Sequence, residues 1–370
     1  LSDDYIKFIR YAEHFIEKNK TGIVAMITNN SFLDGIVHRQ MRKHLLQTFD
    51  EIYVLDLHGN AKKKETAPDG SKDENVFDIQ QGVAISIMIR KPDKKDKLGI
   101  VNFAELYGKR ENKFLSMNEI DLKSISWKKL NAIEPNYYFV NKNFNSEEIY
   151  SSWFSLKEFF NDFGSGIKFR KDSLLIKNHF TSESVKNLLK DMNERDDNFI
   201  YSKYNFKDTA DWRLKDKKRL FINGHSEDIQ KVQYRPFDLR FSYYPLDKIN
   251  EIIPRGDSRW NLMKHLLFDK NNMCLISTRQ LSTFDFQHVF VSRFLLDMCL
   301  ISLQTKETSY AFPLYLYSED GTKTPNLKTE IVQEIENTVG KTEPEEILDY
   351  IYAVLHSPTY REKYKEFLKI

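Results

Sequence analysis

The first 90 residues alternate between helical and strand-like patterns of apolar positions. Apolar residues recur at helical spacing over residues 1–20, which predicts an amphipathic helix. Continuous apolar runs follow at 22–28, 52–57 and 83–90, and a second helical pattern ends at Phe49. Runs of this length without polar alternation are typical of strands that helices cover on both faces of a sheet.

A polar stretch interrupts this alternation. Residues 58–74 are rich in lysine and contain Pro68 and Gly70, so we expect an exposed and mobile loop there. The order of helix, strand, helix, strand, loop and strand is typical of the second half of a doubly wound α/β sheet. We therefore predict that residues 1–124 form an incomplete α/β sheet, and that the chain is a fragment whose missing strands precede Leu1.

The pattern changes after residue 124. Strand-like and helical segments then mix without regular alternation, which predicts an α+β domain over 125–370. One segment, 237–244, alternates like a strand, and apolar residues at helical spacing over 343–370 predict a helical end. We therefore expect two domains of different class.

Composition and charge narrow the class of protein. Hydrophobic residues make up 41% and charged residues 30%, which is ordinary for a soluble globular chain, and no apolar run reaches membrane-spanning length. Cys274 and Cys299 lack metal-ligand spacing, so we expect reduced thiols in a cytoplasmic protein without a membrane partner. The net charge of +2 does not by itself indicate a polyanion partner. The histidines are too scattered to suggest a metal site, which favours surface or satisfied core positions for them.

Two segments of the first domain carry a resemblance to a known family. They are Asn30–Leu33, with the sequence NSFL, and Asn75–Arg90, which contains the third apolar run. Together with the elements between them, they resemble the gamma class of DNA N6-adenine methyltransferases. In that class an aromatic residue at this place stacks on the flipped target adenine, so the resemblance implies base stacking for Phe77. The alternative is that Phe77 is a core aromatic in front of a buried strand.

Four motifs of the second domain carry a further resemblance. They occur in the order Ser165–Asp172, Tyr234–Arg240, Phe312–Tyr317 and Asp349–Arg361. This series resembles the Type ISP single-polypeptide restriction–modification enzymes, which fuse a nuclease, a translocase, an adenine methyltransferase and a C-terminal target-recognition domain. The resemblance implies duplex DNA and upstream domains of the same polypeptide as partners, and S-adenosylmethionine as cofactor of the full-length protein.

No residue of this chain is predicted to be catalytic. The methyltransferase loop Asn/Asp-Pro-Pro-Tyr should precede the helix that opens the chain, and Pro135–Tyr138 has the wrong order with one proline missing. We predict that this segment only packs its aromatic rings. No glycine-rich turn between a strand and a helix is visible either. We therefore expect the fragment to be inactive alone and to bind no cofactor, because the cofactor site would lie mostly outside it.

Cations of the second domain are candidate DNA contacts. Lysine and arginine suit phosphates, and arginine also fits guanine edges with two hydrogen bonds. Gly164 and Gly166 would let the backbone approach a phosphate closely. The alternative for each arginine is an internal pair with an acid such as Asp238. The predicted DNA-binding residues are Lys168, Arg170, Arg235, Arg240, Arg255 and Arg279.

These interpretations favour part of a site-specific DNA adenine-N6 methyltransferase or restriction–modification enzyme, which recognises duplex DNA and helps to hold a flipped adenine. The alternative is a DNA-binding specificity module that acts with a separate catalytic chain; the sequence upstream of Leu1 would discriminate between the two. A nuclease would need a cluster of acids with a nearby lysine to hold a metal, and the sequence offers no convincing set.

Overall fold

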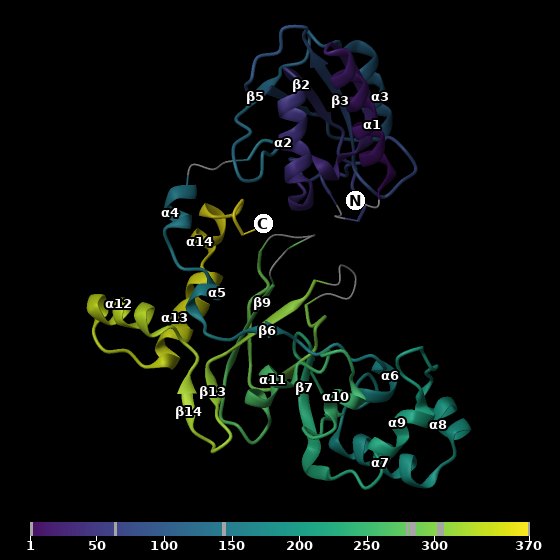
Figure 1. Cartoon of the computed structure of the whole chain (residues 1–370), viewed down its shortest axis with the longest axis vertical. Helices are drawn as coiled ribbons and strands as arrows, with labels where there is room; N and C mark the ends of the chain where they lie inside the picture. Colours follow the sequence, from purple (N-terminus) through teal and green to yellow (C-terminus); the bar gives the residue numbers. More distant parts are fainter. Residues whose placement is uncertain are drawn as a thin grey trace. The chain divides into compact units, whose positions relative to one another are not determined.

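The computed structural model describes residues 3–62, 65–142, 146–278, 281, 286–301 and 307–368. The chain forms two units, Leu1–Phe144 and Asn145–Ile370, each with its own apolar core (Figure 1). None of the helices within the described residues is long and apolar enough to span a membrane.

A five-stranded sheet forms the centre of the first unit. Its elements are α1 (Asp4–Asn19), β1 (Gly22–Asn29), α2 (Arg39–Thr48), β2 (Glu51–Asp56), β3 (Val83–Arg90), β4 (Ile100–Glu105), α3 (Arg110–Glu119) and β5 (Lys128–Leu130). The strand order is β1-β3-β2-β4-β5. β3 is antiparallel to both neighbours, whereas β2 and β4 are parallel. The predicted helices and apolar strands are therefore present, and β3 lies between the two strands that precede it in the sequence.

The edge strand β1 is covered on one face only. Val24 is buried in the core that α1 and α2 share with the sheet, but Ile23 and Ile27 point to the other face and are exposed. The continuous apolar run predicted cover on both faces, and within this chain β1 has it on one. Exposed apolar positions on an edge strand form a surface that another segment can cover.

The segment between β2 and β3 is exposed over residues 68–72, as predicted for a loop over 58–74, but its two ends are anchored. His58, Asp73 and Asn75 are buried. The carboxylate of Asp73 accepts a hydrogen bond from the backbone N–H of Gly59 at 2.6 Å and another from Gly108 at 2.7 Å. These polar side chains are buried because they form hydrogen bonds with backbone groups. The polar character of a segment in the sequence does not show whether its side chains have such partners.

Residues beyond 124 still belong to the first unit. β5 pairs with β4, and Tyr137 and Phe139 pack into the core of this sheet. The backbone N–H of Phe139 donates to Leu33 O at 2.9 Å. The first unit therefore extends to residue 144 rather than to 124, and Pro135–Tyr138 does pack its aromatic rings, with Tyr137 and Tyr138 both buried.

The second unit combines short helices with three small sheets. Its strands are β6 (Gly164–Ser165), β7 (Ile229–Arg235), β8 (Asp238–Tyr243), β9 (Cys274–Thr278), β10 (Phe290–Ser292), β11 (Leu295–Leu296), β12 (Ser309–Pro313), β13 (Tyr315–Tyr317) and β14 (Lys323–Pro325). They are ordered as β10-β9-β12-β6, β11-β7-β8 and β13-β14. This mixture without regular alternation is the α+β class that the sequence predicted.

The helices of the second unit are mostly short. They are α4 (Glu147–Ser151), α5 (Leu156–Phe159), α6 (Asp172–Leu175), α7 (Ser182–Glu194), α8 (Asp197–Tyr204), α9 (Leu214–Lys217), α10 (Ile249–Ile252), α11 (Trp260–Met263), α12 (Thr329–Val339), α13 (Pro344–His356) and α14 (Pro358–Lys363). Local signals start the longer ones: the Thr181 hydroxyl caps α7, and Pro344 opens α13 behind a capping box. α13 and α14 confirm the predicted helical end.

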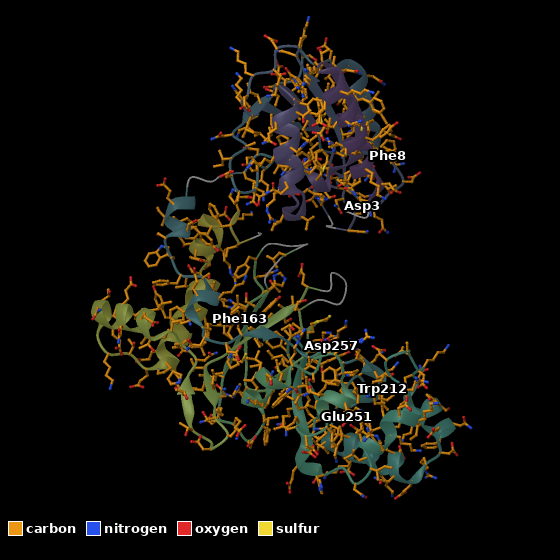
Figure 2. All side chains as sticks on the ribbon, viewed as in Figure 1. Asp3, Phe8, Phe163, Trp212, Glu251 and Asp257 are labelled. Atoms are coloured by element: carbon orange, nitrogen blue, oxygen red, sulfur yellow. The ribbon has the colours of Figure 1, made fainter. Side chains whose placement is uncertain are left out.

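Trp212 anchors the larger core of the second unit (Figure 2). Its ring is fully buried, and its indole N–H donates to Ile252 O at 2.8 Å. A buried tryptophan needs such an acceptor, and this one fixes α10 against the segment before α9. The loop after α10, which contains Asp257, is thereby tied to the core.

Candidate functional site

The first candidate is the Phe77 segment, which leads into β3. The Phe77 ring is 44% exposed, so it has a free face. The buried Asn75 amide holds the segment at both ends: its nitrogen donates to Gly59 O at 3.1 Å and to Gln81 O at 2.6 Å. Its oxygen accepts from the Phe77 N–H at 2.9 Å. The ring is thus presented from a fixed backbone.

Arg110, at the start of α3, braces the same segment from outside. Its guanidinium donates to Asn75 O at 2.7 Å and to Phe77 O at 3.0 Å. It also forms an ion pair with Asp78 at 2.8 Å. These contacts use most of the donor fork of Arg110, and they leave the Phe77 side chain uncovered.

His58 lies behind this segment, directly after β2. Its imidazole contacts Glu65 at 2.9 Å and Glu105 at 3.2 Å, and it stacks on the Tyr107 ring with 3.8 Å between centroids. Burial alone would lower the pKa of His58, but hydrogen bonds to Glu105 and Glu65 and the charge of Asp56 outweigh it and raise the pKa to about 9. His58 is thus a buried histidine whose raised pKa favours the charged imidazolium between two carboxylates.

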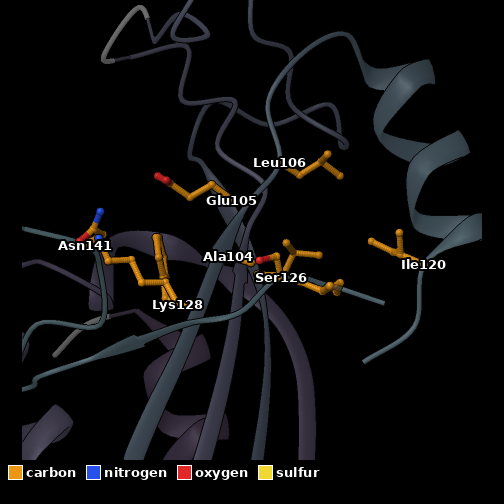
Figure 3. Close-up of a pocket in the computed structure, with 10 residues that line it drawn as sticks. Ala104, Glu105, Leu106, Ile120, Ser126, Lys128 and Asn141 are labelled. Atoms are coloured by element: carbon orange, nitrogen blue, oxygen red, sulfur yellow. The ribbon is translucent and has the colours of Figure 1, made fainter. Parts of the chain in front are cut away.

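A cavity of about 410 Å³ opens at the carboxyl end of β4 (Figure 3). Its wall is mixed: apolar side chains line one part, and Glu105, Ser126, Lys128 and Asn141 line the rest. Glu105 is already bound to His58. The cavity therefore offers a ligand an apolar surface together with Ser126, Lys128 and Asn141.

One cluster among the described residues has a composition that suits a metal. Ligand atoms of Glu13, Glu17 and His44 lie within 4.8 Å of one another. Arg10 forms ion pairs with both carboxylates, and His44 contacts Glu13 at 2.7 Å. These carboxylates thus already have a cationic partner, so we assign no metal to the cluster.

In the second unit, three sequence-distant segments meet around two acids. Arg170 forms ion pairs with Asp211 at 2.7 Å and with Asp257 at 2.5 Å. The exposed Lys168 donates its backbone N–H to Asp257 O at 3.0 Å. Arg255 is 66% exposed in its side chain and lies 3.7 Å from Asp211. Arg170 and Arg255 together balance the charges of the two acids, and the exposed Lys168 adds positive charge beside them.

Gly166, two residues before Lys168, lies in close contact with the backbone of another segment of the chain. A Cβ atom on Gly166 would lie 2.6 Å from Asp297 O. The backbone N–H of the next residue, Ile167, donates to Leu296 O at 2.7 Å. Gly166 is thus needed for packing of the chain against itself, which corrects the expectation that it opens the backbone to a phosphate.

Arg235 is held by an internal acid. It forms an ion pair with Asp297 at 2.8 Å, and its guanidinium lies over the Tyr234 ring, 3.8 Å from the centroid. Burial raises the pKa of Asp297 to about 6, against the opposing charge of Arg235. Burial of the Asp297 carboxylate therefore costs free energy, and the charge of Arg235 offsets part of that cost.

Arg240 is held still more closely. Its guanidinium makes two 2.8 Å hydrogen bonds to the Asp238 carboxylate and a third to Lys177 O. The Phe180 ring covers it, with 3.9 Å to the centroid, and only 12% of its side chain is exposed. The alternative of an internal pair thus applies to Arg170, Arg235 and Arg240, and Arg255 has a longer ion pair with Asp211 at 3.7 Å.

Residues 158–370 match the protein family described as "Type ISP C-terminal specificity domain". The match covers more than half of the chain. The chain belongs to this family. No curated protein matches the chain significantly.

Solved structures share the fold of this Type ISP family member over its whole length. A structure titled "cryoEM structure DrdV-DNA complex" has a TM-score of 0.69 and 19% identity, with 37% of that chain covered. The ATP-dependent Type ISP restriction-modification enzyme LlaBIII bound to DNA has a TM-score of 0.69 and 24% identity, with 24% covered. The structure of a nuclease-deletion mutant of the Type ISP restriction-modification enzyme LlaGI in complex with a DNA substrate mimic has a TM-score of 0.65 and 22% identity, with 34% of that chain covered. The chain thus spans about a quarter to just over a third of these proteins.

The structure sorts the predicted residues of this Type ISP family member by exposure. Phe77, Lys168 and Arg255 are exposed, and Arg279 lies outside the described residues. Sequence reasoning missed Phe237, whose ring is 96% exposed in the turn between β7 and β8. The available signal was the proline before it, because proline followed by a residue and then an aspartate marks a turn rather than a strand.

Proposed function

We propose that this chain is the DNA-recognising part of a Type ISP restriction–modification enzyme, and that its second unit binds duplex DNA. The match of residues 158–370 to the Type ISP specificity domain family carries this proposal. The named structures of the same fold are DNA complexes, which supports the same partner. A specificity domain recognises sequence through contacts with base edges. Its cations bind backbone phosphates and thereby fix the position of the protein along the duplex.

Lys168 and Arg255 are the phosphate contacts that the geometry favours. Both are exposed, and both lie at the cluster formed around Asp211 and Asp257. Arg170 and Arg255 together balance the charges of the two acids, so that they do not repel a phosphate. The backbone of both segments is fixed by the core, which reduces the conformational entropy lost on binding.

For the first unit we propose a role in adenine N6-methylation by the full-length protein, with Phe77 as the stacking surface for a flipped adenine. The free face of its ring and the fixed backbone support this role. An extruded base loses its neighbours in the duplex, and an aromatic face partly replaces them. Phe77 would then bind and orient the base and exchange no proton with it.

The cofactor implied for such an enzyme is S-adenosylmethionine, which would supply the methyl group. The described residues of the first unit do not fit as its complete site. The only carboxylate among the residues that line the cavity at β4, Glu105, is bound to His58 and is not free to hold the hydroxyl groups of a ribose. We therefore derive no step of methyl transfer from this chain, and we propose that upstream domains of the polypeptide provide most of the cofactor site.

The salt dependence of DNA binding tests the role of the second unit. The full chain should bind labelled random-sequence duplexes with an affinity that falls steeply as salt rises, because neutralised phosphates release counterions. Lys168→Ala or Arg255→Ala should each weaken binding to all sequences and reduce the slope of log K against log salt by about one. The exposed Lys186 on α7 provides a matched control, and Lys186→Ala should leave the slope unchanged. Binding that does not respond to salt would refute the proposal.

Cofactor binding and methylation test the role of the first unit. Calorimetry with S-adenosylmethionine should show no saturable binding to this chain alone. In the full-length protein, Phe77→Ala should weaken binding or slow methylation by about 1–3 kcal/mol of lost stacking. Micromolar affinity of this chain for the cofactor would show that the described residues form a site after all.

A further inference from the structure

The turn between β7 and β8 presents the most exposed aromatic ring among the described residues. Phe237 is 96% exposed, and the flanking residues Arg235 and Asp238 pair across the hairpin. Its nearest ring is that of Phe290, at 6.4 Å between centroids and nearly perpendicular. Despite this neighbour, almost the whole Phe237 side chain is accessible to solvent.

The backbone of this turn is unfavourable for phenylalanine. Pro236 fixes its own φ, and Phe237 has a φ of +62°. A proline followed by a residue of positive φ is the pattern of a type II turn, in which glycine or asparagine normally takes the second place. A bulky residue there is strained and gains nothing from burial, and such strain is concentrated at functional sites.

The base of the hairpin is stiff and electrically balanced. Arg235 pairs with Asp297, and Arg240 is bound through two hydrogen bonds to Asp238. Each acid close to the turn therefore has a cation, so the tip carries no uncompensated negative charge that would repel DNA. The hairpin thus holds an apolar ring out into solvent on a rigid support.

We propose that Phe237 is an apolar base-contacting residue, which the β7–β8 hairpin inserts into the major groove of duplex DNA. This proposal rests on the proposed DNA binding of the second unit. The major groove admits β-strands, and apolar side chains contact thymine methyl groups there; the tip of the hairpin, 235–238, lies beyond the residues of β7 that pair with β11. The internally paired arginines then stiffen the ribbon, while Lys168 and Arg255 contact the backbone of the duplex.

Salt titration separates this role from phosphate binding. In the full chain, Phe237→Ala should weaken binding to the duplexes that the unaltered chain selects from a random-sequence pool about tenfold or more, and the slope of log K against log salt should not change, because a phenyl ring releases no counterions. Arg255→Ala should lower that slope by about one. Trp153→Ala, which removes another exposed aromatic side chain of the same unit, should leave both affinity and slope unchanged.

Two further variants report contact and folding directly. The indole introduced by Phe237→Trp should be quenched by acrylamide in the free protein and shielded when duplex DNA is added. Phe237→Gly should bind DNA as weakly as Phe237→Ala but unfold at an equal or higher temperature, because glycine relieves the positive φ. A weaker binder that is not less stable cannot owe its defect to unfolding.

The outcomes distinguish this inference from the function on which it rests. If the unaltered chain shows no salt-dependent binding of duplex DNA, the proposed function fails. If it binds, but Phe237→Ala binds within twofold as tightly and the introduced indole stays accessible to acrylamide, only the role of Phe237 is refuted. A change of oligomeric state in Phe237→Ala, measured by sedimentation, would also refute it, because the ring would then serve contact between copies of the chain.

Discussion

The ammonium group of Lys113 lies 2.7 Å from the carboxylate of Asp73, and both side chains are fully buried. The same ammonium donates to Leu57 O and to Glu74 O, each at 2.7 Å. α3 is thereby tied to the end of β2 and to the segment that carries Phe77. A buried charge is tolerated here because all three of its donors have acceptors.

Removal of this ammonium should destabilise the first unit strongly. Lys113→Met keeps much of the aliphatic volume but leaves Asp73 buried without its cation. We expect the free energy of unfolding to fall by about 3–5 kcal/mol, as for other broken buried pairs. Hydrogen exchange of the β2 and β3 amides measures this loss in the first unit separately.

The neighbouring Lys72 provides the control for this prediction. Its ion pair with Glu74 is exposed, with 2.9 Å between the charged atoms. Lys72→Met should therefore cost no more than about 1 kcal/mol. An equal decrease in the free energy of unfolding for Lys113→Met and Lys72→Met would contradict the prediction that the buried pair stabilises the fold more than the exposed one.

Phe77→Ala should leave the first unit nearly as stable as before. The ring is 44% exposed, so its removal should cost less than about 1.5 kcal/mol. Phe103, buried in the same sheet, is the matched control, and Phe103→Ala should cost about 3–5 kcal/mol. A loss for Phe77→Ala as large as that for Phe103→Ala would make Phe77 a core residue and remove its stacking role.

The charge on His58 should make the first unit sensitive to alkaline pH. The folded pKa of about 9 exceeds the ordinary value of 6.5, so protonation favours the folded state. This contribution, on the order of 3 kcal/mol, is complete below pH 6.5 and is lost as the pH rises through 9. Urea denaturation should therefore show that the difference in stability between the unaltered chain and His58→Asn shrinks from pH 6 to pH 10.

Asparagine suits this test because it tolerates the φ of +50° at position 58. Glu65→Gln removes one of the acids that raise the pKa of His58, so its stability should start to decline at a lower pH. A stability difference that stays constant across this range would mean that His58 is not charged in the folded protein.

Arg240 should act on stability rather than on sequence reading. Arg240→Ala removes two hydrogen bonds to Asp238 and should cost about 1.5–3 kcal/mol of stability. A double-mutant cycle with Asp238→Ala should give a coupling of at least about 0.5 kcal/mol, because the two side chains are in contact. Arg255→Ala, at an exposed position, is the control and should change stability by less than about 1 kcal/mol. If Arg240→Ala changed the DNA sequence preference and left the stability unaltered, Arg240 would be a base-contacting residue after all.

Local periodicity alone determined much of the secondary structure. The helical spacing over residues 1–20 corresponds to α1, and the apolar runs correspond to β1, β2 and β3. The helical end and the order of the four family motifs were also readable, because each depends on neighbouring residues in the chain. Periodicity reports which side of an element is buried, and that is a local property.

Only the tertiary structure decided which cations remain available. Asp211 and Asp257 pair with Arg170, and Asp297 lies 62 positions from Arg235, so no local pattern predicts these partners. The placement of β3 between β1 and β2 likewise depends on long-range pairing. An ion pair or a strand register forms between segments that the fold brings together, and its energy depends on distance in space, which a one-dimensional sequence does not contain.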